Sequence, residues 1–218
     1  MPIPKVIYQT YKTDELPFLT KWHIYNLKKR NPEFEYQFYD DQRVSDFIQS
    51  EFGSEIFDLY SKINIGAAKA DFFRYAILYK KGGIYLDIDS LSLAKFNTFI
   101  QPSDSAIISL ESNLEYYVQW ALVYEPGHPF LAKTLEIVID NLKHNRYPND
   151  VHAMTGPSAY TKAIRESMTT LSKINYRELG VDYEGKFKFH YRFSKFFIYG
   201  LFRKKHWRTM QEQIPVLK

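Results

Sequence analysis

Apolar residues recur at helical spacing in the stretch that leads up to a Gly-Gly pair. We expect Gly82 and Gly83 to end this helix, because glycine adopts the left-handed geometry of a helix C-terminus without steric cost. The short apolar run that follows, residues 84–86, predicts a buried strand. The apolar positions of the predicted helix are Phe72, Phe73, Ala76, Ile77 and Tyr79.

Similar patterns elsewhere alternate between strand and helix, which predicts an α/β layer with a largely parallel sheet. Asp40 and Asp41 are candidate N-caps, and Thr155-Gly156-Pro157 is typical of a helix start. Beyond residue 172 the pattern indicates only a strand or hairpin arm at 186–193. The predicted strands are 5–10, 35–39, 106–110 and 117–123, and the further helices are 19–29, 41–52, 54–62, 129–144 and one from 157.

Composition supports one folded globular domain over residues 1–218. The chain is 45% hydrophobic and 17% aromatic, which argues against disorder, and no linker, charge block or repeat divides it. It has no cysteine, which excludes disulfides and thiolate metal sites and is compatible with a reducing compartment. Neither a signal peptide nor a membrane span is evident, so we expect a cytoplasmic protein.

The formal net charge of +4 arises mainly near the C-terminus, in a basic and aromatic segment at 195–218. Three interpretations remain open for its core, residues 195–208: a helix packed on the sheet with a solvated basic edge, peripheral contact with an anionic membrane, or nucleic-acid binding. The packed helix is the simplest and nucleic acid the least favoured, so we expect no nucleic-acid partner.

Four charged residues near the Gly-Gly pair suggest a site. Asp71 and Arg74 are three apart on the predicted helix and therefore share a face, whereas Asp87 and Asp89 directly follow the predicted strand. In an extended chain residues two apart point the same way. Either pair alone is common at protein surfaces. Together, at the carboxyl end of a strand, they predict a site for a divalent cation and a diphosphate.

The segment that carries these residues resembles a known family. KADFFRYAILYKKGGIYLDIDS (69–90) is similar to the core signature of glycosyltransferases with a DXD sugar-binding motif, which include yeast-type initiating mannosyltransferases, bacterial capsule enzymes and clostridial glucosylating toxins. IPKVIYQTYK, EPGHPFL and MTGPSAYT also resemble family motifs, so the likeness covers about residues 2–165. It implies a GT-A-type, Rossmann-like fold, a nucleotide-sugar donor, a glycan acceptor, Mn²⁺ or Mg²⁺, and retention of anomeric configuration.

The resemblance also implies roles for the acidic motif and the helix pair. Asp89 would bind the metal directly, and Asp87 would be shared between the metal and the donor's hydroxyls. Asp71 and Arg74 would hold the sugar ring, with Tyr85 supporting that pocket.

Further roles follow from more divergent positions. Thr10 and Tyr11 lie where the family places its nucleobase wall, and Gln119 lies where relatives carry Asn or Gln near the reacting carbon. His128 is expected to organise a turn. Relatives close the domain with a His-x-x-Ser-Trp-like segment, and the nearest match here is Lys205-His206-Trp207. His206 is therefore a candidate for the last metal ligand, with an ordinary surface histidine as the alternative.

The interpretation that these features favour is a metal-dependent, retaining hexosyltransferase that uses a UDP-sugar. A GDP-mannose-dependent mannosyltransferase is the nearest alternative. A phosphohydrolase using Asp87 and Asp89 would leave Asp71 and Arg74 without a role, and a non-enzymatic carbohydrate- or membrane-binding module would leave the Asp-x-Asp unexplained. Gly-x-Ser-x-Gly, P-loop and His-Glu-x-x-His motifs are all missing from the sequence.

Overall fold

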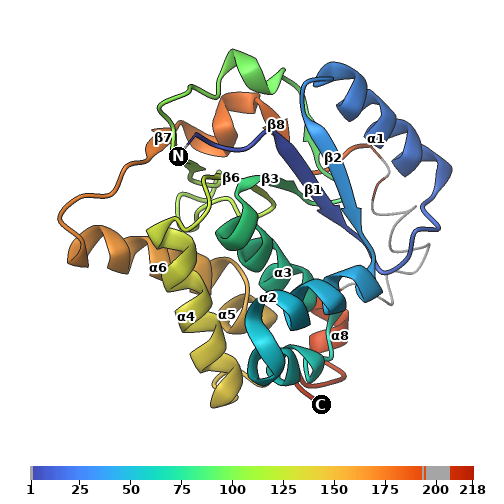
Figure 1. Ribbon diagram of the computed structural model, residues 1–218. Coiled ribbons are helices and arrows are strands. Elements are labelled where there is room, and N and C mark those ends of the chain that lie inside the picture. The colour runs from blue at the N-terminus through green and yellow to red at the C-terminus, as the bar shows by residue number, and fades with distance from the viewer. Residues whose placement is uncertain (1, 193, 195–206) are drawn as a thin grey trace.

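The computed structural model describes residues 2–192, 194 and 207–218. Within these residues, six strands form a twisted sheet in the order β2-β1-β3-β6-β5-β7, with helices on both faces (Figure 1). The strands are β1 (Val6–Thr10), β2 (Glu35–Tyr39), β3 (Gly83–Leu86), β5 (Ala106–Ser109), β6 (Ala121–Tyr124) and β7 (Arg177–Leu179).

Strand pairing gives the sheet a mixed but mostly parallel character, as predicted. β1 pairs in parallel with β2 and β3, and β5 pairs in parallel with β7, whereas β6 is antiparallel to both β3 and β5. The prediction of a strand at 117–123 was wrong in its bounds. Tyr117 makes an isolated bridge to Leu110, and regular pairing begins at Ala121, after the chain has turned Gln119 and Trp120 into the site described below.

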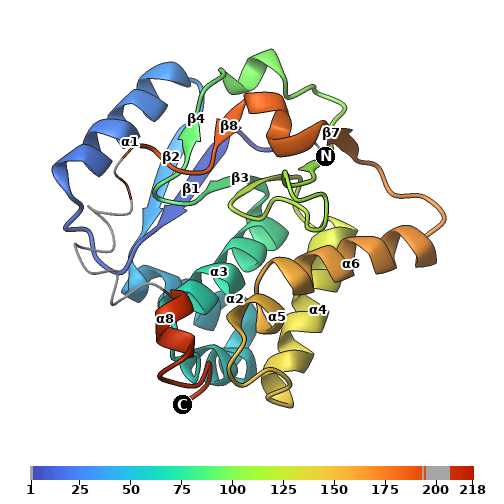
Figure 2. The same cartoon turned by 180° about the vertical axis from the view of Figure 1, so that it is seen from behind.

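The helices divide between the two faces of the sheet, and Figures 1 and 2 both place α1 on the side opposite α3, α4 and α6. The predicted break between helices at 41–52 and 54–62 is present inside α2 at Gly53, whose φ of 78° is not helical. The helices are α1 (Phe18–Arg30), α2 (Asp41–Ser61), α3 (Gly66–Lys81), α4 (Pro129–Lys143), α5 (Val151–Met154), α6 (Pro157–Thr170) and α8 (Trp207–Gln211), with short 3₁₀ turns η1 (Phe96–Thr98) and η2 (Val181–Gly185).

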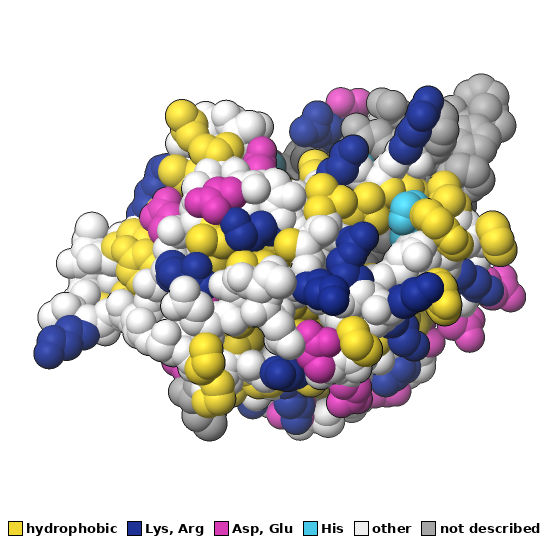
Figure 3. Space-filling model, turned by 90° about the horizontal axis from the view of Figure 1, so that it is seen from above, with side chains coloured by type: hydrophobic (Ala, Val, Ile, Leu, Met, Phe, Trp, Pro, Cys, Tyr) yellow, Lys and Arg dark blue, Asp and Glu magenta, His cyan; other side chains and the backbone are white. Residues whose placement is uncertain are grey.

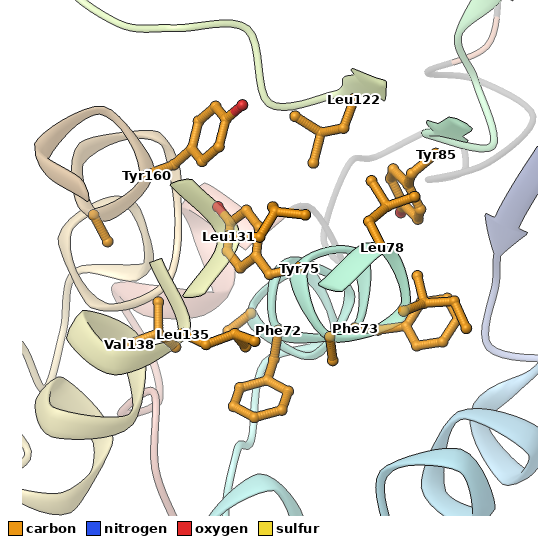
Figure 4. Packing of buried hydrophobic residues seen from close by; sticks show 14 of the residues in the cluster. Phe72, Phe73, Tyr75, Leu78, Tyr85, Leu122, Leu131, Leu135, Val138 and Tyr160 are labelled. Atoms are coloured by element: carbon orange, nitrogen blue, oxygen red, sulfur yellow. The ribbon is translucent and has the colours of Figure 1, made fainter. Parts of the chain in front are cut away.

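Successive residues of the central strands pack into two separate hydrophobic cores, one on each face of the sheet. Tyr8 and Tyr85 point to the core shared with α2 to α6, and Ile7 and Ile84 point to the core shared with α1, η1 and η2. Figure 4 shows the first core, where side chains from α3, α4 and α6 meet those of β3 and β6. Both faces of the central strands are therefore buried, which explains why β3 is apolar throughout.

The predicted caps are confirmed. The side chain of Asp40 accepts a hydrogen bond from the backbone N–H of Arg43 at 2.8 Å and caps α2. His128 caps α4: its Nδ1 accepts from the N–H of Phe130 at 3.2 Å, so it organises the turn as predicted. Pro157 begins α6 directly after Gly156.

The junction between α3 and β3 requires its two glycines. Gly82 and Gly83 both have positive φ, 65° and 110°. A Cβ at Gly82 would lie 2.6 Å from Cδ of Pro126 and 2.9 Å from Cδ of Pro4, and one at Gly83 would lie 2.7 Å from the carbonyl oxygen of Val6. No larger residue fits without moving the backbone, so the glycines fix how β3 follows α3 and enters the sheet beside β1.

A separate two-stranded ribbon joins β4 (Leu91–Ser92) to β8 (Phe187–Lys188). The strand or hairpin arm predicted at 186–193 is confirmed only over these two residues, and it pairs outside the main sheet. Leu91 pairs with Lys188 and Ser92 with Phe187 in antiparallel register. Extended by two residues, the same register sets Asp89 opposite His190.

Candidate functional site

A cavity of about 670 Å³ opens where the parallel strands β1 and β3 end. The eight predicted site residues that lie in the described part of the chain all line it. Register explains part of this, because Ile7 pairs with Ile84 and continuing the ladder brings Thr10 level with Asp87. The carboxyl edge of a parallel sheet is where such folds bind ligands. The eight residues are Thr10, Tyr11, Asp71, Arg74, Tyr85, Asp87, Asp89 and Gln119.

Arg74 lies at the centre of the polar wall. Its Nη2 is 2.9 Å from Oδ1 of Asp87 and 3.3 Å from Oδ1 of Asp71, and its Nη1 donates to the carbonyl oxygen of Gln119 at 2.9 Å. The guanidinium also lies over the ring of Tyr85, 4.8 Å from its centroid. Burial alone would lower the pKa of Arg74, but the Asp87 carboxylate, aided by Tyr85 and Asp71, raises it overall, so the charge is secure.

Asp71 is buried and held by neutral donors as well as by Arg74. Gln119 donates to its Oδ1 at 2.8 Å, and the hydroxyl of Thr155 donates to its Oδ2 at 2.9 Å. Tyr75 closes this network, since its hydroxyl accepts from Gln119 at 2.6 Å and donates to the carbonyl oxygen of Thr155 at 3.1 Å. Burial raises the pKa of Asp71 despite these partners. The sequence interpretation missed Tyr75 and the contact of the Thr155 side chain with Asp71.

Asp87 begins a tight turn, which corrects the expectation of an extended Asp-x-Asp. The N–H of Ser90 donates to the carbonyl oxygen of Asp87 at 2.9 Å, so the two carboxylates do not simply point the same way along a strand. The hydroxyl of Tyr85 donates to Oδ1 of Asp87 at 3.1 Å, and Gln9 donates to its carbonyl oxygen at 3.0 Å. Burial, with smaller contributions from Asp89 and Asp71, raises the pKa of Asp87 to about 6 against the opposing effect of Arg74.

Asp89 is buried, 3% exposed, and faces His190 across the end of the β4–β8 ribbon. Oδ2 of Asp89 and Nδ1 of His190 are 2.8 Å apart, yet their orientation forms no hydrogen bond, and neither atom has another partner among the residues that the structure describes. The backbone N–H of Tyr191 donates to the carbonyl oxygen of Asp89 at 3.0 Å and holds the two segments together. Two buried ligand atoms without donors are the environment that a shared cation would satisfy.

The described residues do not by themselves form a complete set of metal ligands. No group of three or more His, Asp or Glu side chains forms a ready ligand set within them. Asp87, Asp89 and His190 nevertheless supply the oxygen and nitrogen atoms that Mn²⁺ or Mg²⁺ accepts, and such ions take further ligands from phosphate and water. The residues present therefore fit a divalent cation that a diphosphate completes. His190 was missed because its separation from Asp89 along the chain gives no motif, and its flanking Phe189 and Tyr191 suggested only a strand.

The end of the cavity near β1 is lined by Thr10, Tyr11 and neighbouring side chains. The Thr10 hydroxyl donates to the carbonyl oxygen of Tyr39 at 2.8 Å, so that side chain is engaged with β2. Tyr11 is half-buried and its ring lines the cavity beside Lys12 and Tyr60. This end therefore offers an aromatic surface, as the nucleobase assignment requires.

Glu111, His152 and the start of α6 at Gly156 and Pro157 also line the cavity. Nδ1 of His152 lies 2.8 Å from the hydroxyl of Ser158, and burial lowers the pKa of this histidine. His206 lies outside the described residues, as does most of the 195–208 segment. Among the residues that the structure describes, no helix is both long and apolar enough to cross a bilayer.

Comparison with protein families matches residues 17–106 to a model described as a glycosyltransferase sugar-binding region containing a DXD motif. An uncharacterized glycosyltransferase, L373, of Acanthamoeba polyphaga mimivirus is 33% identical over 179 residues, which cover 79% of this chain and 67% of the relative. The initiation-specific alpha-1,6-mannosyltransferase of Schizosaccharomyces pombe is 29% identical over 75% of this chain, which spans only 48% of that enzyme.

Two solved structures share the fold. The PaToxG glycosyltransferase superposes with a TM-score of 0.62 at 20% identity, covering 78% of this chain and 71% of that one. The UDP-bound glycosyltransferase domain of the YGT toxin gives a TM-score of 0.57 at 9% identity, covering 83% and 80%. These likenesses confirm the predicted GT-A-type fold.

Proposed function

This chain belongs to the family of glycosyltransferases whose sugar-binding region contains a DXD motif, and on that premise we propose that it moves a hexosyl group from a nucleotide sugar to a hydroxyl of a glycan. The observation that carries the proposal is the convergence of Asp71, Arg74, Asp87 and Asp89 on one cavity at the carboxyl ends of β1 and β3. A phosphohydrolase would not need the buried pair on α3.

In this proposal Asp71 and Arg74 hold the sugar ring. A carboxylate has about four lone-pair positions, so Asp71 can accept from sugar hydroxyls while Gln119 and Thr155 hold it in place. Arg74 is fixed by Asp87 and lies over the ring of Tyr85, and it lines the cavity beside Asp71. The rigid network suits recognition, since the side chains need little reordering when the sugar binds.

Asp87, Asp89 and His190 would hold a divalent cation, Mn²⁺ or Mg²⁺. When bound, such an ion stabilises the negative charge that develops on a departing nucleoside diphosphate. Among the described residues, Asp89 and His190 offer two buried atoms without a hydrogen-bond partner, and Asp87 lines the same cavity. His206 remains a second candidate for the last ligand.

The reaction that we propose retains the anomeric configuration. The bond between the sugar's anomeric carbon and the diphosphate oxygen breaks, and a bond from that carbon to the acceptor oxygen forms on the same face. The acceptor's proton passes to the departing phosphate oxygen. Gln119 lies beside Asp71 and would contact the donor near the reacting carbon.

We propose a UDP-sugar as the donor, supported by the UDP-bound toxin domain that shares the fold. GDP-mannose is the second candidate, because relatives are named as mannosyltransferases. Tyr11 would stack on either base, so the cavity wall alone does not select between them. We also propose that the protein is located in the cytoplasm, at the periphery of a membrane.

The deciding experiment is a thermal-shift series with UDP, GDP, UDP-sugars and GDP-mannose, each with and without Mn²⁺. A ligand that binds only the folded state raises Tm, so one diphosphate should stabilise the protein in a Mn²⁺-dependent manner. Incubation of the preferred donor with a glycan, followed by NMR of the product, then reports the sugar and its anomeric configuration. Failure of every nucleotide to raise Tm with Mn²⁺ would contradict the proposal, and release of inorganic phosphate from simple phosphate esters would favour a phosphohydrolase.

A further inference from the structure

Helix α1 turns three large aromatic side chains toward solvent. Phe18 is 85% exposed, Trp22 is 50% exposed and Tyr25 is 60% exposed. Their spacing of four and then three residues places them on one face of the helix, and Lys29 continues the same stripe. Scattered exposed aromatics are ordinary, but a contiguous row of three on one helix marks an interaction surface.

The opposite face of α1 already packs on the protein, so the aromatic row is not a core face left open by chance. Leu27 lies in the second core. The hydroxyl of Thr20 is 2.8 Å from the hydroxyl of Tyr191, and the ring of His23 stacks on Tyr191 at 4.1 Å between centroids. Through the N–H of Tyr191, this contact reaches the carbonyl oxygen of Asp89. The inward face of α1 therefore packs on Tyr191, next to the candidate site, and the aromatic row lies on the other face of the helix.

The charge on α1 indicates what it contacts. The helix carries Lys21, Lys28, Lys29 and Arg30 and no acidic residue. Lys21, Lys28 and Lys29 are exposed, whereas Arg30 donates to the backbone of Ser92. Asp14 and Glu15 precede the helix, in the loop, so the basic charge predominates along the aromatic row itself. Figure 3 shows hydrophobic and basic side chains side by side on the end of the molecule that it views.

We propose that the outer face of α1, defined by Phe18, Lys21, Trp22, Tyr25 and Lys29, binds an anionic lipid surface. Tryptophan and tyrosine favour the interface between lipid and water, and lysines beside them are attracted to negatively charged headgroups. A helix that lies flat on a bilayer presents one continuous stripe of this kind. Bound in this way, α1 would hold the whole protein at the surface of the bilayer.

Vesicle sedimentation of the full chain tests this surface. Large vesicles of phosphatidylcholine with roughly one-third phosphatidylserine are compared with pure phosphatidylcholine vesicles, at low salt and at about 0.5 M NaCl, where charges are screened over a few Å. The wild type should sediment with the anionic vesicles and be released by salt. Two variants, Phe18→Ser/Trp22→Ser/Tyr25→Ser and Lys21→Glu/Lys29→Glu, should each bind at least about tenfold more weakly.

The matched control changes exposed residues away from α1: Tyr147→Ser/Leu171→Ser with Lys173→Glu. It should bind vesicles as the wild type does, and Tm and nucleotide binding should be unchanged in all variants. Because the lysine variant alters only exposed side chains, it keeps the test valid if the aromatic variant folds poorly. The proposal is overturned if the wild type does not bind anionic vesicles, binds neutral ones equally well, or if both α1 variants bind like the control. None of these outcomes bears on donor binding.

Discussion

Nη2 of Arg74 lies 2.9 Å from Oδ1 of Asp87, which joins the middle of helix α3 to the first residue after strand β3. The side chains are 5% and 23% exposed, so neither charge is well solvated. Asp71 shares the same guanidinium. The proposed sugar pocket and cation site are thus parts of one electrostatic unit, and a change at either residue should be felt at both.

The first prediction separates folding from catalysis at Arg74. Arg74→Ala leaves the carboxylates of Asp71 and Asp87 without the guanidinium that they share, and it should lower the unfolding free energy by about 3–5 kcal/mol. Arg74→Lys keeps the charge but not the planar fork, so it should fold, keep nucleotide affinity and lose most transfer. Urea unfolding, calorimetric titration with the preferred nucleotide and product assays measure the three quantities. Equal loss of nucleotide affinity and transfer in Arg74→Lys would assign Arg74 to the nucleotide instead.

Asp89→Asn should abolish Mn²⁺-dependent donor hydrolysis and transfer. Asparagine has nearly the same shape and keeps the backbone hydrogen bond to Tyr191, so the fold should persist while cation affinity is lost. Turnover at several Mn²⁺ concentrations, with circular dichroism as the check on folding, measures the effect. Wild-type rates at ordinary Mn²⁺ concentrations would remove the cation from the proposed reaction.

His190→Ala should raise the Mn²⁺ concentration needed for half-maximal activity by about 10- to 100-fold. The imidazole faces Asp89 at 2.8 Å and its removal takes away one candidate ligand without opening the main core. His144→Ala is the matched control, because that histidine is exposed on the helix end of α4, away from the cavity. If both variants show the same Mn²⁺ dependence as the wild type, the last ligand lies elsewhere.

Tyr11→Ala should weaken nucleotide binding by about 1–3 kcal/mol, the usual contribution of a base stacked on an aromatic ring. Tyr11→Phe keeps the ring and should bind almost as the wild type does. Titration of each variant with UDP and with GDP at a fixed Mn²⁺ concentration measures the nucleotide affinity. If the alanine and phenylalanine variants bind alike, the ring makes no stacking contact with the base.

A structural prediction concerns pH and Asp104. This buried carboxylate accepts from Nε of Arg177 at 2.9 Å and from the N–H of Gln101 at 2.8 Å. Burial alone would raise the pKa of Asp104, but Arg177 and the Gln101 amide lower it below its ordinary value. The folded state therefore binds this proton less readily than the unfolded state, so the contribution to stability is present above pH about 4 and is lost as the pH falls further.

Asp104→Asn should accordingly lower the unfolding free energy at neutral pH by about 1–3 kcal/mol. The difference from the wild type should shrink as the pH is lowered below about 4, because the wild-type carboxyl then becomes neutral as well. Urea unfolding at a series of pH values measures both. A difference that stays constant down to pH about 3 would mean that the carboxylate's charge is not what holds Arg177.

Much of the fold follows from local sequence signals. Most helices and strands begin and end where local signals predict, because each signal acts through the backbone geometry of its own residues. These signals are the period of the apolar residues, Asp40, Gly53, Gly82, His128 and Pro157. β7 was not predicted, since its three residues are partly exposed and gain their order from pairing with β5. The expectation of one domain over residues 1–218 stays a prediction.

The candidate site likewise contains residues that the sequence predicts and residues that only the structure reveals. Asp71, Arg74, Asp87 and Asp89 lie within one short segment, and the helix, Gly-Gly break and strand predicted for that segment bring them together. Thr155, Tyr75 and His190 reach the site through tertiary contacts, and nothing in their neighbouring residues signals this. The turn at Asp87 was also unforeseen, because a hydrogen bond from Ser90, rather than strand pairing, sets the backbone there.

The β4–β8 ribbon makes the proposed cation site depend on the C-terminal part of the chain, because it brings His190 to Asp89. A cation held by Asp89 and His190 would close a loop of roughly a hundred residues, a constraint that mainly reduces the freedom of the unfolded chain. The match to the family model ends at residue 106, so Asp89 lies inside the matched region and His190 lies outside it. A register slip of one residue in the ribbon would turn His190 to the other face. If His190 holds the cation as proposed, substitutions after residue 186 abolish activity even when every residue of the DXD segment is unchanged.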